Sequence, residues 1–415
     1  MWVVSTTRKH WERISVKKIL TFVVFILIFV FSFSYKFIFL FIADGMGLPH
    51  LQLANMYKES TTNRGLNVFK LPYFSIVETS SLNGVTDSAA AITAILSGEK
   101  TYNNRINKDS LGANLSPITY QLKEKGYKIG VISTNTLVDA TPAGAYAFVD
   151  ERTSRNEIVG YLLQSNFDLF IGGGKAYFNK QEAEKYGYQY SETLKNGPYI
   201  GKELIVLYYG NFPFLTDNED RVPLADTLSY AIKKFGNDQF FIIIEGGRID
   251  HAAHAHDTIS LIKEIIDFDD SVKVALDFLK QHPNDTLIIV TADHATGGLT
   301  LGNGFISLNK IKNYGFSYEK FVDILNTTDN YEDFSKRLNL NVDLKNYFYI
   351  SKSSSKTLSY QSEIVKYYYD YLNNLAGINW SSFGHTIDYV PLFSNISRNV
   401  YFIKNNEIFS VFEIF

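Results

Sequence analysis

The sequence contains no cysteine and little net charge. The lack of cysteine excludes disulfide frameworks, thiolate metal sites and cysteine nucleophiles, so any metal must be held by aspartate, glutamate, histidine or hydroxyl groups. The formal net charge is -3, and the isoelectric point is near 6.3. A chain without an overall basic field offers no surface for tracking a nucleic-acid backbone, and we expect no nucleic-acid partner. Recognition of an anion such as phosphate must then be local.

Internal repeats and low-complexity tracts are also missing, whereas apolar residues are plentiful. The 415 residues are 46% hydrophobic, which suffices for a large buried core. We expect one large catalytic domain over residues 36–415. Within it, residues 298–382 lack the strand and helix alternation found elsewhere, and polar, aromatic pieces such as Tyr347–Ser355 replace it. We interpret that segment as an inserted cap.

The first 35 residues follow the order of a secretory signal. Basic residues precede the apolar run Ile19–Phe31, and Ser32–Ser34 follows it. The alternative is an uncleaved membrane anchor, because the run extended to Tyr35 approaches the roughly 17–25 residues of a spanning helix. We favour the signal, since Lys36 and the first core strand follow at once and leave no spacer. Either interpretation predicts export, with the catalytic domain periplasmic, extracellular or anchored outside the cytoplasm.

Short apolar runs alternate with amphipathic stretches after Lys36. This alternation is typical of an α/β fold, a doubly wound, mostly parallel sheet with helices on both faces. The predicted strands are Phe37–Ile42, Tyr127–Ser133, Asp168–Ile171, Leu204–Leu207, Phe240–Ile244 and Thr286–Val290. The predicted helices include Pro117–Lys125, Glu157–Gln164, Ala225–Lys234 and Asp257–Lys280.

Three of the predicted strands end in carboxylates or histidines. Asp44 follows the first strand, and Glu245 and Asp250 follow the fifth. Asp293 and His294 follow the sixth. Each carboxylate alone could be a helix cap or a turn residue. Because ligands bind at the carboxyl ends of strands in such folds, the three together predict a site.

A serine stands at the start of a predicted helix in Thr86–Ala94. Asp87 or Ser88 is a good first residue, and the small residues that follow allow close packing on the sheet. Free backbone N–H groups and the positive end of the helix dipole suit an incoming phosphate and a developing alkoxide. Serine and aspartate also cap many helices for structural reasons, so this stretch is not specific alone.

Further metal-ligand types occur in three separate stretches. Asp250–Asp257 supplies carboxylates and imidazoles, and Asp250 and His254 share a helical face. Nitrogen and oxygen ligands without sulfur suit Zn²⁺, although a loose histidine-rich tract can bind metal opportunistically. Asp139 and Thr141 offer oxygen groups that suit Mg²⁺. His385 is a lone histidine far along the chain.

The order of these motifs along the chain resembles the alkaline phosphatase family. The resemblance covers essentially the whole chain after Lys36, and over 298–382 it holds only in position. The motifs that carry it are Asp44–Gly47, Asp87–Ala94, Asp139–Pro142, Glu245–His251, Thr291–His294 and Gly384–Thr386.

The resemblance implies a metal-dependent phosphomonoesterase with two zinc ions and one magnesium ion. Ser88 would attack phosphorus and become a phosphoserine, and its hydrolysis would release inorganic phosphate. The implied ligands of one zinc ion are Asp44, Asp293 and His294, completed by Ser88. Those of the other zinc ion are Asp250, His254 and His385. The implied magnesium ligands are Asp44, Thr141 and Glu245, with Asp139 near the ion or bound to it through water.

The resemblance also implies an arginine that clamps the substrate phosphate. Arg152 stands at the matching distance from Asp139, and Arg155 is the competing candidate. His251 lies where family members differ, which implies a supporting role near the zinc or the phosphate. His256 matches no family role.

Small-molecule phosphate monoesters and a homodimer are the partners that the resemblance implies. Activity should rise toward alkaline pH, because metal ligands must be deprotonated. Two same-fold alternatives are a sulfatase and a phosphodiesterase. Ser88–Ile92 lacks the proline and arginine of the sulfatase pattern, and a diesterase would lack the arginine clamp. A catalytically silent binding protein is the alternative from another class, but every expected ligand is present.

Overall fold

The computed structural model describes residues 35–194, 197–302, 304–312, 314–353, 358–397 and 400–414. The predicted signal or anchor lies outside the described residues, apart from Tyr35. In the described part of the chain, no helix combines the length and the apolar character needed to cross a bilayer.

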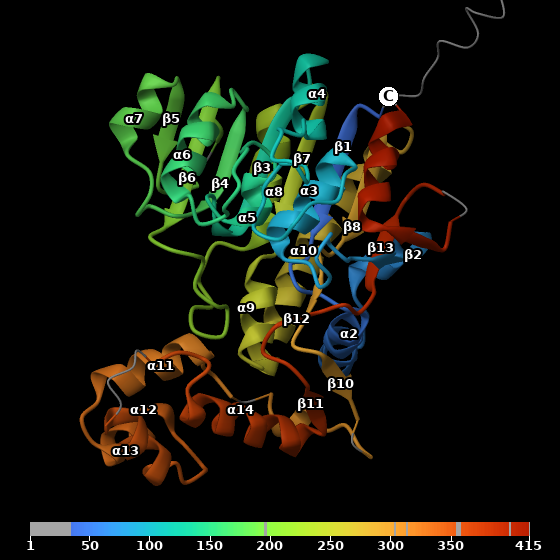
Figure 1. Cartoon of the computed structure of the whole chain (residues 1–415). Coiled ribbons are helices and arrows are strands. Elements are labelled where there is room, and N and C mark those ends of the chain that lie inside the picture. The colour runs from blue at the N-terminus through green and yellow to red at the C-terminus, as the bar shows by residue number, and fades with distance from the viewer. Residues whose placement is uncertain are drawn as a thin grey trace, which may run out of the picture.

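A ten-stranded sheet forms the centre of the molecule (Figure 1). Its strand order is β14-β2-β13-β8-β1-β7-β3-β4-β6-β5, and β13 alone runs antiparallel to its neighbours. The strands are β1 Phe37–Ile42, β2 Tyr73–Glu78, β3 Lys128–Thr136, β4 Leu169–Gly173, β5 Tyr188–Ser191, β6 Lys202–Tyr208, β7 Phe240–Glu245, β8 Thr286–Thr291, β13 Val390–Ser394 and β14 Phe402–Lys404. All six predicted strands are present, with ends shifted by up to three residues.

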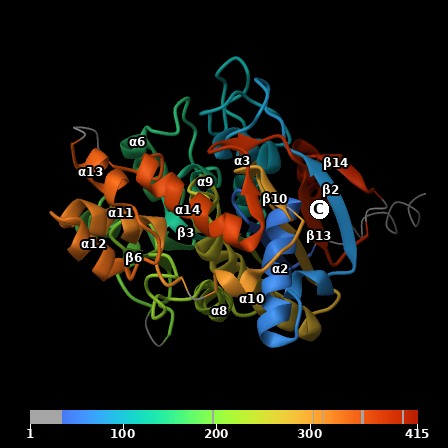
Figure 2. The ribbon, with the colours of Figure 1, turned by 90° about the horizontal axis from the view of Figure 1, so that it is seen from below.

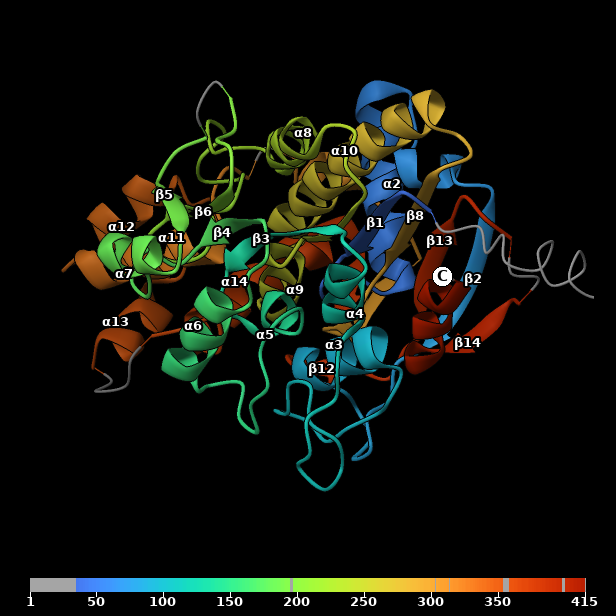
Figure 3. The same ribbon diagram turned by 90° about the horizontal axis from the view of Figure 1, so that it is seen from above.

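Helices cover both faces of this sheet, as Figure 3 shows. One face carries α2 Leu48–Thr62, α8 Leu224–Phe235 and α10 Thr258–Gln281. The other carries α3 Ser88–Ser97, α4 Ile118–Glu124, α5 Ala140–Ala143 and α6 Arg155–Gln164, together with the 3₁₀ segment η3 Asn405–Ile414. The predicted α/β class, with a mostly parallel sheet between two helical layers, is confirmed.

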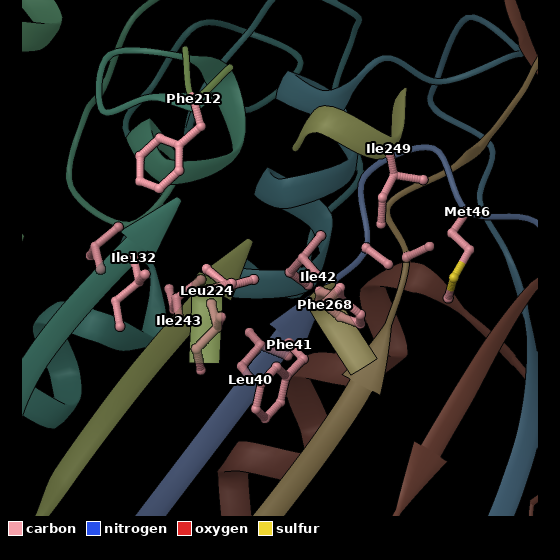
Figure 4. Close-up of a cluster of buried hydrophobic side chains, with 14 of the residues drawn as sticks. Leu40, Phe41, Ile42, Met46, Ile132, Phe212, Leu224, Ile243, Ile249 and Phe268 are labelled. Atoms are coloured by element: carbon pink, nitrogen blue, oxygen red, sulfur yellow. The ribbon is translucent and has the colours of Figure 1, made fainter. Parts of the chain in front are cut away.

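The central strands are buried on both faces because helices lie above and below them. All six residues of β1 are buried, which explains why its sequence is a continuous apolar run rather than an alternating one. Phe41 packs edge-on against Phe268 of α10, with ring centroids 5.8 Å apart. Figure 4 shows this cluster continuing through Ile42 to Met46 and Ile249. The loops that follow the strands are thereby fixed on a rigid core.

The segment 298–382 lies beyond the carboxyl edge of the sheet (Figures 1 and 2). Its elements are β10 Leu299–Leu301, η2 Leu308–Lys310, α11 Tyr318–Thr327, α12 Tyr331–Leu338, α13 Lys345–Ser353, α14 Glu363–Ala376 and β11 Ile378–Trp380. β10 pairs with β11, so the two ends of the segment are joined. Two short strands, β9 Ala295–Thr296 and β12 His385–Thr386, pair beside it.

Candidate active site

The carboxyl ends of β1, β7 and β8 bring the predicted carboxylates together. Ile42 of β1 is in register with Glu245 of β7 and with Thr291 of β8. Asp44 follows β1 by two residues, and Asp293 follows β8 by two. All of these side chains except that of Ile42 are polar, and all are buried. The parallel register of adjacent strands therefore places acidic groups at one edge, as predicted.

Ser88 is the first residue of α3 and is buried at the same edge. Asp87 caps the helix, because its side chain accepts a hydrogen bond of 2.9 Å from the backbone N–H of Ala90. The hydroxyl oxygen of Ser88 lies 3.2 Å from Nε2 of His294. The helix start thus carries the serine to the histidine that follows β8.

Asp44, Asp293 and His294 form the first ligand group. Their ligand atoms lie within 4.8 Å of one another. Nε2 of His294 is 3.2 Å from Oδ2 of Asp293 and 3.6 Å from Oδ1 of Asp44. The other oxygen of Asp293 accepts the backbone N–H groups of Gly45 and His294. Oδ2 of Asp293 and Oδ1 of Asp44 are buried without a hydrogen-bond partner, so both are free to hold a cation.

Asp250 is the centre of the second ligand group. It lies on α9 Arg248–His254, one turn before His254, and its Oδ2 is 3.3 Å from Nε2 of that histidine. Its Oδ1 is 3.8 Å from Nε2 of His385. The imidazoles of His385 and His294 are stacked with centroids 3.6 Å apart, and Asp250, His294 and His385 also form a compact group. The two expected zinc sites therefore adjoin each other at these rings.

Each of the three histidines is oriented by a hydrogen bond at its Nδ1. Nδ1 of His254 donates to the carbonyl of Phe383 at 2.5 Å, and Nδ1 of His385 donates to the carbonyl of Thr86 at 2.9 Å. The hydroxyl of Thr296 donates to Oδ1 of Asp250 at 2.6 Å, which leaves its oxygen to accept from Nδ1 of His294 at 3.2 Å. When it is neutral, each ring offers Nε2 as a lone-pair donor, the arrangement seen in histidine metal sites.

Further buried oxygen atoms belong to residues of β3, β7 and the start of α5. The hydroxyl of Ser133 donates to Oε2 of Glu245. Oε1 of Glu245 and the hydroxyl of Thr141 are buried and have no hydrogen-bond partner. Asp139 caps α5 through the backbone N–H of Ala140 at 2.8 Å. Oxygen donors of this kind suit a hard cation.

The crowding of buried carboxylates shifts their pKa values strongly. Burial, with Asp139 and Asp293 nearby, raises the pKa of Glu245 to about 8. Burial, with the Asp250 charge nearby, raises the pKa of Asp293 to about 7. Burial, with Asp293, Asp250 and Glu245 nearby, raises the pKa of Asp44 well above its usual range. Since like charges repel in a site of low dielectric, the cluster requires positive charge to be fully ionised.

The histidines beside Asp250 lower the pKa of that carboxyl group, whereas the pKa values of the other three carboxyl groups are raised. Although burial favours the neutral acid, the neighbouring His254, His385 and His294 hold the pKa of Asp250 well below its usual range. Burial opposes the charged form of His254, but Asp250 and the carbonyl of Phe383 raise its pKa to about 9. Asp250 is therefore the member of the cluster that is most readily ionised.

Arg152 contacts the residue that precedes Ser88. One guanidinium nitrogen lies 3.3 Å from Oδ2 of Asp87, and another lies 3.2 Å from Oδ1 of Asp139. Arg155 lies 3.6 Å from Asp139 and donates to the carbonyl of Val138. The contact with Asp87 places the Arg152 guanidinium beside the start of α3.

His251 contacts an arginine of its own helix. Its Nδ1 is 2.5 Å from the guanidinium of Arg248. Burial and this positive neighbour lower the pKa of His251 to about 4. Arg248 is itself buried, lies over the ring of Phe214 at 3.8 Å, and pairs with Glu319 of α11 at 2.7 Å. The segment 298–382 thus reaches the site through Glu319.

Sequence reasoning did not identify Thr296 and Ser133 as site residues. Each donates one hydrogen bond to a carboxylate of the cluster. A lone threonine or serine in an ordinary loop or strand carries no sequence signal of such a role. Only the two-residue spacing from His294 to Thr296 could have pointed to the former.

Comparisons with known proteins give one family. The model of the family described as "Alkaline phosphatase" matches residues 35–206 and 207–413. "Alkaline phosphatase 4" of Bacillus subtilis (strain 168) is 33% identical over 285 residues, which cover 63% of this chain and 61% of that protein. "Alkaline phosphatase 3" of the same strain is 29% identical over 387 residues, which cover 85% of this chain and 82% of that protein.

A solved structure with magnesium is also similar. It is a variant of the alkaline phosphatase of the Antarctic bacterium TAB5 with Mg bound in the M3 site. It is 26% identical to this chain, has a TM-score of 0.69, and covers 92% of this chain and 98% of its own.

Proposed function

Because the chain belongs to the alkaline phosphatase family, we propose that it hydrolyses phosphate monoesters with Ser88 as the nucleophile. The predictions of family and of a phosphatase are confirmed by the same match. The observation that carries the nucleophile assignment is the distance of 3.2 Å from the Ser88 hydroxyl to Nε2 of His294. His294 belongs to both compact ligand groups.

The donors at the site fit two zinc ions and one magnesium ion. The fit rests on the buried oxygens of Asp44, Asp293, Glu245 and Thr141 that have no hydrogen-bond partner. Nitrogen and oxygen donors suit Zn²⁺, whereas a set of oxygens alone suits Mg²⁺. A magnesium ion in the TAB5 relative supports the third cation. When bound, paired cations lower the pKa of an attacking hydroxyl and stabilise the departing oxygen.

The ligand assignment follows the grouping of the side chains. We assign one zinc ion to Asp44, Asp293 and His294, with Ser88. The other zinc ion is assigned to Asp250, His254 and His385. Magnesium is assigned to Asp44, Thr141 and Glu245, with Asp139 nearby. His294 lies between the two zinc groups and contacts His385. His251 supports the site from Arg248 without serving as a ligand.

The protein groups bind and orient the substrate phosphate. The start of α3 offers backbone N–H groups to its oxygens. Arg152 presents two parallel N–H donors that match two oxygens of a phosphate. Asp87 and Asp139 hold the guanidinium in place, so the clamp is formed before the substrate arrives.

Two displacements at phosphorus complete the reaction. The Ser88 oxygen forms a bond to phosphorus as the bond to the alcohol oxygen breaks, and the alcohol leaves with a proton. Water then attacks the phosphoserine, the bond to the Ser88 oxygen breaks, and inorganic phosphate and the free hydroxyl are regenerated. Both halves use the same Arg152 contacts.

Assembly and location are further parts of the proposal. The family supports a homodimer, and the N-terminal sequence supports export with the catalytic domain outside the cytoplasm. Size measurement of the purified protein by light scattering tests the first. Detection of activity outside intact cells tests the second.

Turnover of a nitrophenyl phosphate monoester by the purified chain tests the proposal. Ser88→Ala should lower kcat by at least about 10³, since the nucleophile is lost. Ser97→Ala at the other end of α3 is the matched control and should retain activity. A chelator should abolish turnover, and zinc with magnesium should restore it. Faster turnover of a bis-nitrophenyl diester than of the monoester would contradict the proposal.

A further inference from the structure

His385 is presented by a short loop with little regular structure. The loop Ser381–Gly384 joins β11 to β12, and β12 contains only two residues. Gly297 binds the loop through its carbonyl, which accepts the backbone N–H of Ser381 at 3.1 Å. Such a short pairing leaves the direction of the His385 ring dependent on what else holds the loop.

His256 contacts this loop from the connection between α9 and α10. Its Nε2 donates to the carbonyl of Ser382 at 2.8 Å. Its ring stacks on Phe383 with centroids 4.0 Å apart, and on Trp380 at 5.1 Å. The side chain is buried, and the backbone is in the left-handed region with φ of 57°. A non-glycine residue in that region is uncommon and is held by its surroundings.

Two histidines therefore hold two consecutive carbonyls of the loop. His254 donates to Phe383, and His256 donates to Ser382. A bond to adjacent peptide groups fixes both the position and the rotation of the chain there. His385 follows Phe383 by two residues, so its ring direction depends on that rotation.

The backbone of His256 is fixed in turn by the inserted segment. Nδ2 of Asn373 in α14 donates to the carbonyl of His256 at 2.9 Å. Oδ1 of Asn373 accepts from the hydroxyl of Thr258 at 2.5 Å, and that hydroxyl accepts from Nε1 of Trp380 at 3.3 Å. These contacts form one network that links α14, α10 and the loop.

We propose that His256 is a positioning residue that fixes the Ser381–Gly384 loop so that His385 points at Asp250. The inference rests on the proposed function, because it takes His254 and His385 to share a zinc ion. His256 does not contact the substrate in this account. It acts through the Ser382 carbonyl, and α14 supports it through Asn373, which gives the inserted segment a part in the site.

Zinc affinity, measured by competition with a fluorescent chelator, tests this inference on the full chain. Four proteins are compared, namely wild type, His256→Phe, His256→Gln and His385→Ala. The phenylalanine keeps the ring stacking and removes the N–H donor, whereas glutamine keeps an N–H donor and removes the ring. The thermal midpoint of each metal-free protein reports the fold independently of zinc.

The expected pattern separates positioning from a structural role. Wild type should bind two zinc ions tightly, and His385→Ala should lose one of them. His256→Phe should lower the affinity for that same ion by about tenfold and leave the affinity for the other ion unchanged. The thermal midpoint of the metal-free variant should equal that of the metal-free wild type. His256→Gln should recover part of the lost affinity.

Three outcomes would overturn the inference. Wild-type affinity for both ions in His256→Phe would show that the Ser382 contact does not position a ligand. An equal loss of affinity for both ions, together with a lower thermal midpoint of the metal-free variant, would show a general structural role. If His385→Ala bound zinc like wild type, the ligand assignment itself would fail, and the positioning role would fall with it.

Discussion

Nε2 of His294 lies 3.2 Å from the hydroxyl oxygen of Ser88 and 3.2 Å from Oδ2 of Asp293. One nitrogen thus joins the residue at the start of α3 to a carboxylate that has no other partner at that oxygen. A cation that replaced these direct contacts would touch the Ser88 hydroxyl and the Asp293 carboxylate together.

Thr296 should control cation affinity without being a ligand. Thr296→Val removes the hydrogen bonds to Asp250 and His294 while keeping the shape of the side chain. We expect zinc affinity to fall about tenfold, as is typical when an outer hydrogen-bond partner of a ligand is lost. Chelator competition measures this. Thr300→Val, at an exposed position of β10, is the control, and equal affinities in the two variants would refute the role.

Arg152 should contribute to substrate binding through its fork geometry. Arg152→Lys keeps the charge but cannot give two parallel hydrogen bonds. We expect kcat/KM for a nitrophenyl monoester to fall about 10- to 100-fold, a loss of about 1.4–2.7 kcal/mol of transition-state stabilisation. Steady-state kinetics measures this. Arg155→Lys serves as the control, and a larger loss there would mean that Arg155 is the clamp.

The stability of the metal-free protein should fall as pH rises. The pKa of Asp293 is raised to about 7, that of Glu245 to about 8 and that of His254 to about 9. In the unfolded chain carboxyls release protons near ~4 and histidines near ~6.5. The folded protein therefore binds more protons than the unfolded chain between about pH 6.5 and 9, and the free energy of unfolding decreases through that window.

Buried histidines shift the stability in the opposite sense but at lower pH, and burial lowers the pKa of His294 well below its usual range. Burial lowers the pKa of His50 and of His251 to about 4, so their effect is complete above the ~6.5 at which the unfolded chain titrates. Denaturant unfolding at pH 6.5 and 9 should show a decrease on the order of 2 kcal/mol without metal. With zinc and magnesium the decrease should disappear, because cations bind the deprotonated ligands. A metal-free stability that rose across this window would argue against the carboxylate cluster.

The central part of the fold was predictable because its strands are buried on both faces. Their continuous apolar runs, such as Phe37–Ile42, are distinctive in the sequence. The strands β2 and β13, which lie second and third from one edge of the sheet, were not predicted. β2 is partly exposed and mixes apolar with polar residues, and β13 contains Pro391, which argues against a strand. Their pairing depends on tertiary contacts that no local pattern reports.

The site was predictable to the extent that it consists of charged residues at strand ends. Asp44, Glu245 and Asp293 were found that way, and the family resemblance supplied Ser88 and the grouping into sites. The supporting contacts were not predictable. Ser133, Thr296 and His256 act through hydrogen bonds to residues remote in sequence or to backbone carbonyls, and the spacing of residue types contains no information about such contacts.

Mass spectrometry of the protein quenched in acid during turnover tests the central claim most directly. Acid preserves a phosphoserine ester, and the peptide that contains Ser88 can be sequenced by fragmentation. We expect one added phosphoryl group located on Ser88, absent from the Ser88→Ala variant and removed after the substrate is exhausted. Steady turnover of the monoester with no phosphoryl group on Ser88 at any time, or with the group on another residue, would contradict that expectation.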